Sequence, residues 1–474
     1  MGIAKLYGQK ASGADINGII KDYHVYAGEN ISAGDLVEFI NGLSGYTSET
    51  TSDTVIRNSA YDGFSLYAVA LDENRVFVVH SNSSNYYLYG VVLTINNSKI
   101  SKGTDTQLCT TANTGRIFVP RRLSDGKIFI AYARVSNSYK LYGMLVTISG
   151  TTPAVLDDRT LSNKVNDGVG IDVTVTYDAN GNEYIFVTHS ALDYCRLYGI
   201  VCSIIKDSNT ITYGTNTELL GDYTGYVIST TPITYDNTAC GGKYLIAHSS
   251  SSNYYLSAIV CTVVGTTITK GTDTQFSTES KTGNVISTES LSNGDVLVVH
   301  SDSGERVAAK VLSVVGTTIT QKYQKDSLIS AYYSGRTIST QLLENDRVFI
   351  AHTYGGSSKD YLHGVIITCT GTEITVGTDT VLSSADYSGY KTSSLLLDSV
   401  NIFIAHSYSA NYHLYAQMWS VDEVNNIPVN QVRIAQYETQ VRKTTTTQFD
   451  GVAKTRGVGG TTTAPKDYVS IYTL

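Results

Sequence analysis

Histidine, the side chain that most often binds metals and exchanges protons near neutral pH, recurs at one aligned position along this chain. A short apolar run ends at this position each time, usually as His-Ser. The aligned residues are His80, Tyr132, His189, His248, His300, His352 and His406. They are separated by 52, 57, 59, 52, 52 and 54 positions. If these side chains converged, they could form a metal site or a ring of proton-transfer groups.

The repeat that carries the histidines predicts how they are arranged. In the unit spanning about 223–278, four β-rich segments are bounded by Gly, Asn, Asp and Ser; they are 226–230, 244–247, 255–263 and 268–270. A fixed period of this size, with several β segments per unit, is typical of a radial or stacked repeat protein. One antiparallel sheet per unit corresponds to a propeller blade. We therefore predict an all-β fold with a seven-bladed β-propeller over residues 46–434.

The apolar runs lack the alternation of a half-exposed strand. Runs such as 76–79, 128–131 and 348–351 are continuously apolar, as expected for middle strands buried between two face-to-face blades. Residues near 50–58 align with 104–109, the outermost strand of the first unit. We predict that this segment completes the last blade and closes the ring, which leaves no free sheet edge.

Propeller geometry argues against chemistry shared by the aligned histidines. Blades repeat about every 51° around the axis, which places equivalent side chains about 10 Å apart, whereas zinc ligands lie within about 2.0–2.3 Å of one ion. Tyr132 also replaces one histidine. We therefore expect each ring to tie its strand to a neighbouring loop. We predict neither a metal site nor a cofactor.

Tyrosine dominates the aromatic residues, with 36 Tyr against 10 Phe. In a propeller, the loop between the second and third strands lies on the same face as the connection between blades, and here both are rich in Tyr, Asn, Ser and Gly. Antibody paratopes use the same residue types, and sugars, with apolar ring faces and hydroxyl edges, suit them. The alternative is that these tyrosines pack between blades and cap strand ends. The candidate ligand-binding residues are Asn85, Tyr86, Tyr87, Asn137, Tyr139, Tyr194, Tyr226, Asn253, Tyr254, Tyr255, Tyr333, Tyr390, Asn411 and Tyr412.

Composition and charge narrow the range of partners. Charged residues make up 16% of the chain and the net charge is −8, so we expect no nucleic acid and no membrane as partner, since both attract a basic face. No stretch approaches the roughly 20 apolar residues of a membrane-spanning helix. Cys202 and Cys261 occupy the same third-strand position in different units, and Cys369 lies two residues further on. We expect buried, unpaired thiols, which suit a reducing cytoplasm.

Enzyme signatures are weak in this sequence. A sialidase-type propeller would carry Ser-x-Asp-x-Gly-x-Thr-Trp turns and an Arg cluster, whereas the one Trp, Trp419, lies outside such a context. Glycosidase chemistry needs two carboxylates aimed at one bond, and the acidic residues fall mainly in turns. No Gly-rich phosphate loop, His-Glu-x-x-His or Gly-x-Ser-x-Gly motif stands out. We predict a protein that is not an enzyme, with a glycan-active hydrolase as the alternative.

The two ends of the chain fit no blade. Residues 1–45 and 435–474 are each β-rich and turn-bounded. Because a propeller brings its ends together, these segments can pair into one small β domain that carries the propeller as an insertion. We predict a small β-barrel-like module built from residues 1–45 and 435–474.

Short motifs in these end segments resemble a family of viral proteins. Ser-Ala-Gly-Asp-Leu-Val at 32–37, followed much later by Gly-Val-Ala-Lys-Thr at 451–455 and a Gly-Gly turn at 459–460, resembles the small β-barrel of tailed-bacteriophage head-decoration proteins. Repeats such as Ile-Ala-His-Ser, Ser-Gly-Tyr and Asn-Tyr-Tyr-Leu-Tyr-Gly are similar to those of structural proteins in phages of Gram-positive bacteria.

The resemblance implies a virion surface protein, a capsid decoration or head-fibre-like component that is assembled in the bacterial host cytoplasm. The implied partners are other virion proteins, either the major capsid protein or a tail component, together with host or mucosal glycans bound by the propeller; the resemblance is compatible with an oligomer. A tail receptor-binding protein is the alternative. The candidate virion-docking residues are Asp35, Leu36, Val37, Gly451, Val452 and Ala453.

Overall fold

The computed structural model of this chain divides into two compact units, residues 1–50 with 431–474, and residues 51–430. The predicted boundaries were 45/46 and 434/435, a few residues from these. The structure describes residues 53–429 except 58–62, 82–85, 97–98, 112–113, 135–138, 163, 165–166, 179, 192–193, 207, 237–240, 251–252, 357–358, 385–387, 399–400, 409–411 and 423–426. In the other unit it describes the backbone of the strands alone.

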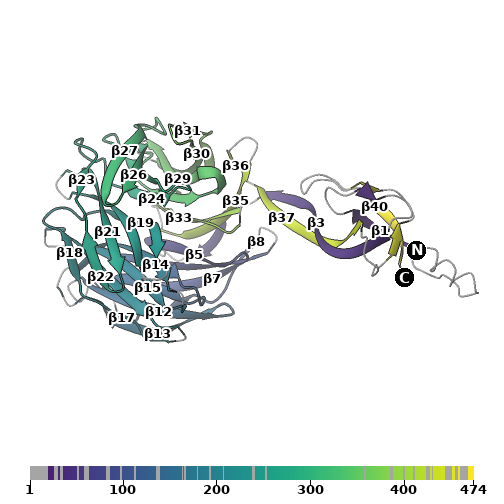
Figure 1. The fold of residues 1–474 in the computed structure, drawn as a ribbon, viewed down its shortest axis with the longest axis horizontal. Coiled ribbons are helices and arrows are strands. Elements are labelled where there is room, and N and C mark those ends of the chain that lie inside the picture. Colours follow the sequence, from purple (N-terminus) through teal and green to yellow (C-terminus); the bar gives the residue numbers. More distant parts are fainter. Residues whose placement is uncertain are drawn as a thin grey trace, which may run out of the picture. The chain divides into compact units, whose positions relative to one another are not determined.

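The larger unit consists of seven antiparallel sheets, one for each sequence repeat (Figure 1). The first strands of neighbouring blades contact one another around the axis, and later strands lie further out. In five blades a short additional strand pairs with the third strand and extends the outer edge. The predicted all-β, seven-bladed propeller is therefore confirmed. Among the described residues, helical structure is limited to the 3-10 turn η2 (Glu344–Asp346), and none of them belongs to a helix long and apolar enough to cross a membrane.

The blades follow the chain in order. Blade 1 contains β5 (Ser65–Asp72), β6 (Arg75–Ser81), β7 (Leu88–Asn96), β8 (Lys99–Lys102) and β9 (Thr106–Gln107). Blade 2 contains β10 (Phe118–Arg122), β11 (Ile128–Arg134), β12 (Lys140–Ser149) and β13 (Thr152–Thr160). Blade 3 contains β14 (Asp167–Tyr177), β15 (Glu183–Ala191), β16 (Leu197–Ile204), β17 (Thr212–Tyr213) and β18 (Thr217–Leu220). Blade 4 contains β19 (Ile228–Asp236), β20 (Gly241–Ser249), β21 (Leu256–Val264), β22 (Thr267–Lys270) and β23 (Thr274–Gln275).

The last three blades have the same order. Blade 5 contains β24 (Ile286–Ser290), β25 (Val296–Ser301), β26 (Val307–Val315) and β27 (Thr318–Lys325). Blade 6 contains β28 (Ile338–Leu342), β29 (Arg347–Gly356), β30 (Lys359–Cys369), β31 (Ile374–Val376) and β32 (Thr380–Ser383). Blade 7 contains β33 (Lys391–Leu396), β34 (Asn401–Ser407), β35 (Leu414–Asp422) and β36 (Ile427–Val429), and it is completed by β4 (Thr54–Arg57) from the start of the propeller.

Ring closure occurs where the sequence predicted it. β4 pairs antiparallel with β35, with Val55 opposite Tyr415 and Thr54 opposite Ala416. The seventh blade thus takes strands from both ends of the propeller, and this pairing closes the ring.

Facing pairs of side chains explain how the middle strands fit between blades. An added Cβ on Gly90 would lie 2.5 Å from the ring of Phe77, and the same clash exists between Gly364 and Phe349 at 2.8 Å. Blade 4 has Leu245 and Ala258 at the two equivalent positions. In these three blades the second strand carries Phe where the third carries Gly, and Leu where it carries Ala, whereas blade 7 combines Phe403 with Ala416. This exchange conserves core volume.

The strand-end histidines His80 and His248 are structural, as expected. Nε2 of His80 lies 3.0 Å from Oδ1 of Asp105, and Nε2 of His248 lies 3.0 Å from Oδ1 of Asp273. In each case the carboxylate comes from the outer edge of the same blade. Tyr132 makes the equivalent contact, because its hydroxyl donates to Asp158 at 2.7 Å. The described cysteines also match expectation: Cys109, Cys195, Cys202, Cys261 and Cys369 are buried and form no disulfide with one another, and burial raises the pKa of the Cys261 thiol to about 12.

The strands of the two chain ends pair with each other. They are β1 (Ile20–Val25), β2 (Asn30–Ile31), β3 (Leu36–Thr50), β37 (Gln431–Lys443), β38 (Gly451–Ala453), β39 (Gly457–Val458) and β40 (Tyr468–Thr473). They adopt the order β1-β37-β3-β38-β40, and β2 pairs separately with β39. Leu36 lies opposite Val452, and Val37 lies opposite Gly451. Residues 36–37 and 451–453, the described parts of the two motif-bearing segments, therefore belong to neighbouring strands. Asp35 lies outside the described residues.

Candidate functional site

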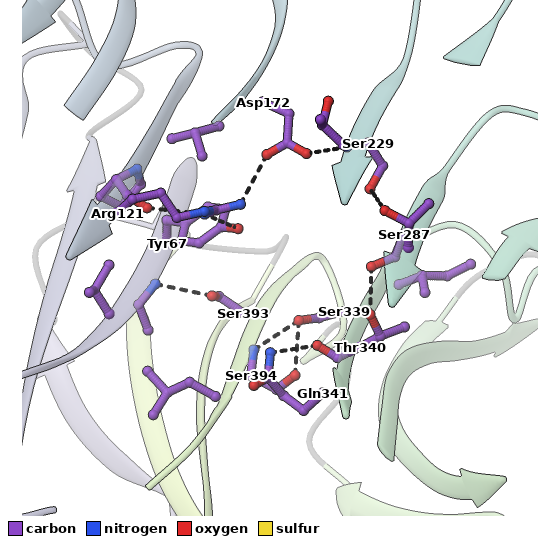
Figure 2. A pocket seen from close by; sticks show the side chains of 18 of the residues that line it. Tyr67, Arg121, Asp172, Ser229, Ser287, Ser339, Thr340, Gln341, Ser393 and Ser394 are labelled. Carbon is purple, nitrogen blue, oxygen red and sulfur yellow. Dashed lines mark hydrogen bonds and ion pairs between the residues drawn. The ribbon is translucent and has the colours of Figure 1, made fainter. Parts of the chain in front are cut away.

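The innermost strands of the seven blades enclose a cavity of about 450 Å³ on the propeller axis. β5, β10, β14, β19, β24, β28 and β33 all contribute to its lining. Figure 2 shows that its side chains are mainly hydroxyl-bearing on one side, with Arg121 and Asp172 on the other. The cavity is therefore polar, unlike the apolar contacts between the blades around it.

Blades 4 to 7 present a hydroxyl group at the same position of the innermost strand. The four residues are Ser229, Ser287, Ser339 and Ser393. Each hydrogen-bonds to the next blade around the ring. The Oγ atom of Ser229 lies 2.9 Å from Oγ1 of Thr288, and Oγ of Ser287 lies 2.7 Å from Oγ1 of Thr340. The Oγ atom of Ser339 lies 2.9 Å from Oγ of Ser394. The Oγ atom of Ser393 accepts a hydrogen bond from the backbone N–H of Ala68 at 3.0 Å, which joins blade 7 to blade 1.

Blades 1 to 3 replace these hydroxyls with a connected set of larger groups (Figure 2). The guanidinium of Arg121 donates to the hydroxyl of Tyr67 at 2.6 Å and to Oδ1 of Asp172 at 3.0 Å. The backbone N–H of Thr230 donates to Oδ2 of Asp172 at 2.6 Å. With the four serines, these contacts connect every pair of neighbouring blades around the axis.

A second carboxyl group, that of Glu289, lines the same cavity. Its Oε1 atom accepts a hydrogen bond from Thr340 at 2.7 Å. Removal from solvent raises the pKa of Glu289 to about 7, although the Thr340 hydroxyl and the positive charge of Arg121 both oppose this shift. Glu289 is therefore poised between its acid and ionised forms near neutral pH.

Asp172 has a different environment from Glu289. Burial raises the pKa of the Asp172 carboxyl, whereas Arg121 and the backbone N–H groups of Thr230 and Val173 oppose the shift by stabilising the ionised form. One cavity thus contains a carboxyl group that can hold a proton at neutral pH and a second one paired with a cation. Such a pair can supply a general acid and a general base to a polar substrate.

Sequence reasoning missed both carboxyl groups. It placed the acidic residues mainly in turns, but Asp172 and Glu289 lie on the innermost strands β14 and β24. The signal that could have identified Asp172 is its departure from the repeat, because the aligned residues of blades 4 to 7 are all Ser.

The predicted ligand-binding tyrosines lie in the loops after the second strands and in the connections between blades. Tyr86, Tyr139, Tyr194, Tyr254 and Tyr412 have φ angles between 53° and 66°, in the left-handed region. The backbone of these tyrosines bonds to the segments that lead into the next blade. The carbonyl of Tyr86 accepts a hydrogen bond from the N–H of Gly115 at 2.6 Å, and the carbonyl of Tyr254 accepts one from the N–H of Gly283 at 2.6 Å. These loops therefore join neighbouring blades.

Many tyrosine side chains on this face pack against one another. The ring centroids of Tyr226 and Tyr254 are 5.0 Å apart, and those of Tyr390 and Tyr412 are 5.1 Å apart. Tyr194 and Tyr226 remain 55% and 40% exposed. Asn253 is exposed, and Tyr87, Tyr139, Tyr255 and Tyr333 are half-buried. Asn85, Asn137 and Asn411 lie outside the described residues. Ligand binding by this face stays a prediction.

Comparison with known proteins identifies the fold and no family. No family model matches the chain, and no curated protein matches its sequence. A candidate 6-phosphogluconolactonase from Bacteroides fragilis is similar in structure, at 10% identity over 79% of this chain and 99% of that chain, with a TM-score of 0.51. An ulvan lyase bound to -[GlcA(1-4)Rha3S]- covers 78% of this chain and 96% of its own at 10% identity, with a TM-score of 0.47.

An α-L-arabinofuranosidase from Fusarium graminearum is also similar, at 12% identity over 65% of this chain and 93% of that chain, with a TM-score of 0.41. At these identities the likenesses show a shared fold alone. They nevertheless correct one prediction. The expectation that this protein is not an enzyme is wrong as a conclusion about this fold, because a chain named as a candidate 6-phosphogluconolactonase shares it. The sequence motifs sought belong to particular enzyme families, so their absence does not exclude catalysis.

Proposed function

We propose that this protein acts on glycans, and that its axial cavity is a site of glycosidic-bond hydrolysis. The observation that carries the proposal is the pairing of Glu289, with a pKa of about 7, and the Arg121-bound carboxylate of Asp172 in one hydroxyl-lined cavity. Glycosidases require two carboxyl groups in different protonation states at one bond. The surrounding hydroxyls suit a sugar, which both donates and accepts hydrogen bonds.

The proposed reaction uses each group according to its environment. Protonated Glu289 donates its proton to the glycosidic oxygen as the bond to the anomeric carbon breaks. Asp172 accepts a proton from the water that adds to this carbon, so the products are two sugars with free hydroxyl groups. Arg121 is a positioning residue in this scheme, because its guanidinium orients the Asp172 carboxylate through the 3.0 Å contact.

The test is release of reducing ends from a panel of bacterial cell-wall and capsular polysaccharides. We expect Glu289→Gln and Asp172→Asn each to lower the rate at least about 100-fold, as loss of a general acid or base does. Glu73→Gln, in an exposed turn, is the matched control. Binding of the same polysaccharide without release of reducing ends would contradict the hydrolase and indicate a lectin.

A second candidate function, compatible with the first, is display on a tailed-phage virion. Two observations favour it: the motif resemblance at 32–37 and 451–455, and the pairing of those segments in the order β1-β37-β3-β38-β40. We infer that these strands form a small barrel that docks on the major capsid protein or a tail component, through Leu36, Val37, Gly451, Val452 and Ala453. The exposed tyrosines of the propeller would then adhere to host or environmental glycans.

Electron microscopy of intact phage particles labelled with an antibody to this chain tests the display function. Label on the head supports a decoration or head-fibre role, and label on the tail supports a receptor-binding protein. Particles without label would contradict both. Adhesion is tested separately by glycan-array binding of the full chain, which we expect the triple variant Tyr86→Ala, Tyr254→Ala, Tyr412→Ala to lose.

A further inference from the structure

A second cavity, of about 660 Å³, lies where blade 5 departs from the repeat. It is bordered by residues 276–279, which follow blade 4, and by His300, Ala308, Lys310 and Gln324 of blade 5. It does not include the axial residues, so nothing in the proposed hydrolysis uses it.

Ala308 opens this cavity. In blades 1, 2, 3 and 7 a tyrosine ring stacks on the strand-end side chain, for example Tyr89 on His80 with centroids 5.6 Å apart and Tyr415 on His406 at 5.7 Å, whereas blade 4 has Ser257 at this position. Ala308 lies opposite His300 at the same position of the third strand. Replacing a tyrosine ring with a methyl group leaves a space beside the imidazole.

His300 also lacks the side-chain acceptor that its counterparts have at the outer edge of the blade, which is Asp105 for His80 and Asn216 for His189. Gln324 lies opposite Lys310, as Asp158 lies opposite Met144 in blade 2. The amide of Gln324 is occupied by Lys310, whose Nζ donates to Oε1 at 2.5 Å. Among the hydrogen bonds of the described residues, none reaches Nε2 of His300. The His300 residue is only 4% exposed and lines the cavity.

The tautomer of His300 is set by the backbone. Nδ1 lies 2.9 Å from the carbonyl oxygen of Thr282 and 2.7 Å from that of Ser301, so Nδ1 carries the proton. Burial and the nearby charge of Lys310 lower the pKa of His300 to about 4. Nε2 therefore offers a lone pair at neutral pH and can only accept a hydrogen bond.

Lys310 is the complementary group. The equivalent residues are Val91 in blade 1 and Met144 in blade 2, yet here an ammonium group that is 7% exposed lies next to the imidazole. Burial lowers the pKa of Lys310, while the charges of Asp326 and Glu279 oppose that shift. Arg306 and Asp302 also line the cavity, but they pair with each other at 2.8 Å. The carboxylates of Asp326 and Glu279 disfavour an anionic ligand, and the ammonium group of Lys310 disfavours a metal ion.

We propose that this cavity binds a neutral saccharide unit, one hydroxyl of which donates to Nε2 of His300 and accepts from Nζ of Lys310. A hydroxyl group is the simplest group that satisfies a lone pair and an ammonium donor at once. Glu279 and Asp326 can accept from further hydroxyls, and Phe276 offers an apolar surface to the sugar ring. The site is thus a glycan-binding subsite separate from the axial cavity.

The experiment monitors the His300 imidazole by NMR in full-length protein labelled with ¹⁵N-histidine, the signal being assigned with His300→Gln. The probes are methyl α-D-glucoside, methyl β-D-galactoside and methyl α-L-rhamnoside, each titrated to about 50 mM. We expect at least one of them to shift the His300 signals saturably. Ala308→Tyr, which restores the stacked ring, and Lys310→Met, which restores the residue of blade 2, should each weaken binding at least about tenfold.

Glu289→Gln, in the axial cavity, should leave this titration unchanged, so failure of the hydrolase proposal and failure of this one are distinguishable. Lys310→Met keeps the test valid if Ala308→Tyr does not fold. The proposal is overturned if none of the three glycosides shifts His300, if inorganic phosphate or acetate shifts it instead, or if a folded variant binds as tightly as the native chain.

Discussion

Nε2 of His406 lies 2.9 Å from Oδ1 of Asp53, although 353 positions separate the two residues. Oδ2 of Asp53 also accepts hydrogen bonds from Ser383 and Tyr408, at 2.8 and 3.0 Å. One carboxylate therefore fastens the strand that closes the ring to blades 6 and 7. Blades 1, 4 and 6 contain the same His–Asp contact within one blade, whereas the contact to Asp53 joins the first and last parts of the propeller.

Asp53→Ala should destabilise the propeller by about 2–3 kcal/mol, because three buried or half-buried donors lose a charged acceptor. The measurement is the free energy of unfolding in urea. Asp273→Ala is the matched control, since it removes the contact to His248 within blade 4 alone. If Asp53→Ala lowered the free energy of unfolding no more than the control does, this result would contradict a special role of Asp53 in ring closure.

Asp379 should make the propeller sensitive to acid. Burial opposes its ionisation, but hydrogen bonds from His352 and His363 lower its pKa to about 2. A carboxyl group with a depressed pKa in the folded state stabilises the fold above its unfolded value of about 3.9, and this contribution is lost as the pH falls from about 4 towards 2. In Asp379→Asn, unfolding free energies measured across this range should fall less steeply than in the native protein. The same pH slope in both proteins would argue against this contribution.

Gly90→Ala should destabilise the protein by about 2 kcal/mol, because the added Cβ meets the ring of Phe77 at 2.5 Å. The double variant Phe77→Leu, Gly90→Ala reproduces the pair found in blade 4, Leu245 and Ala258, and should recover most of this loss. A double-mutant cycle in urea should give a favourable coupling of about 1 kcal/mol or more. Simple additivity of the two changes would show that the pairs do not conserve volume as we describe.

Glu289 should make stability fall as the pH rises. Its carboxyl group has a pKa of about 7 in the folded protein, above the ordinary value of 4.5, so the folded state holds the proton more tightly than the unfolded state. The free energy of unfolding should therefore decrease between about pH 4.5 and 7. Glu289→Gln should remove this decrease and be more stable than the native protein by about 2 kcal/mol at pH 8. A native-like pH dependence in the variant would contradict the raised pKa.

Repetition made the fold predictable from the sequence. The strand-end His80 and its counterparts mark each blade, and the alignment of 50–58 with 104–109 indicates ring closure before any coordinates are known. Their structural role also follows from geometry, because neighbouring blades hold equivalent side chains too far apart to share an ion.

The candidate site could not be predicted in the same way. Asp172, Glu289 and Lys310 each break the repeat, and a comparison of units finds what the units share. Asp172 and Glu289 are candidate site residues because the innermost strands bring them into one axial cavity, and Lys310 is one because it lines the cavity of blade 5. The tyrosine loops could be predicted in composition but not in conformation. The sequence did not indicate that Tyr86 and Tyr254 adopt left-handed backbone angles and join neighbouring blades.

The sharing of blade 7 between β4 and β33 to β36 also bears on biosynthesis. β4 emerges from the ribosome before any complete blade, yet its partner β35 is translated more than 350 codons later. Until then the first blade has one apolar flank uncovered, and a product truncated before β35 can never cover it. Cellular quality-control proteases and chaperones should therefore recognise incomplete chains readily, and full-length translation becomes the condition for a soluble product.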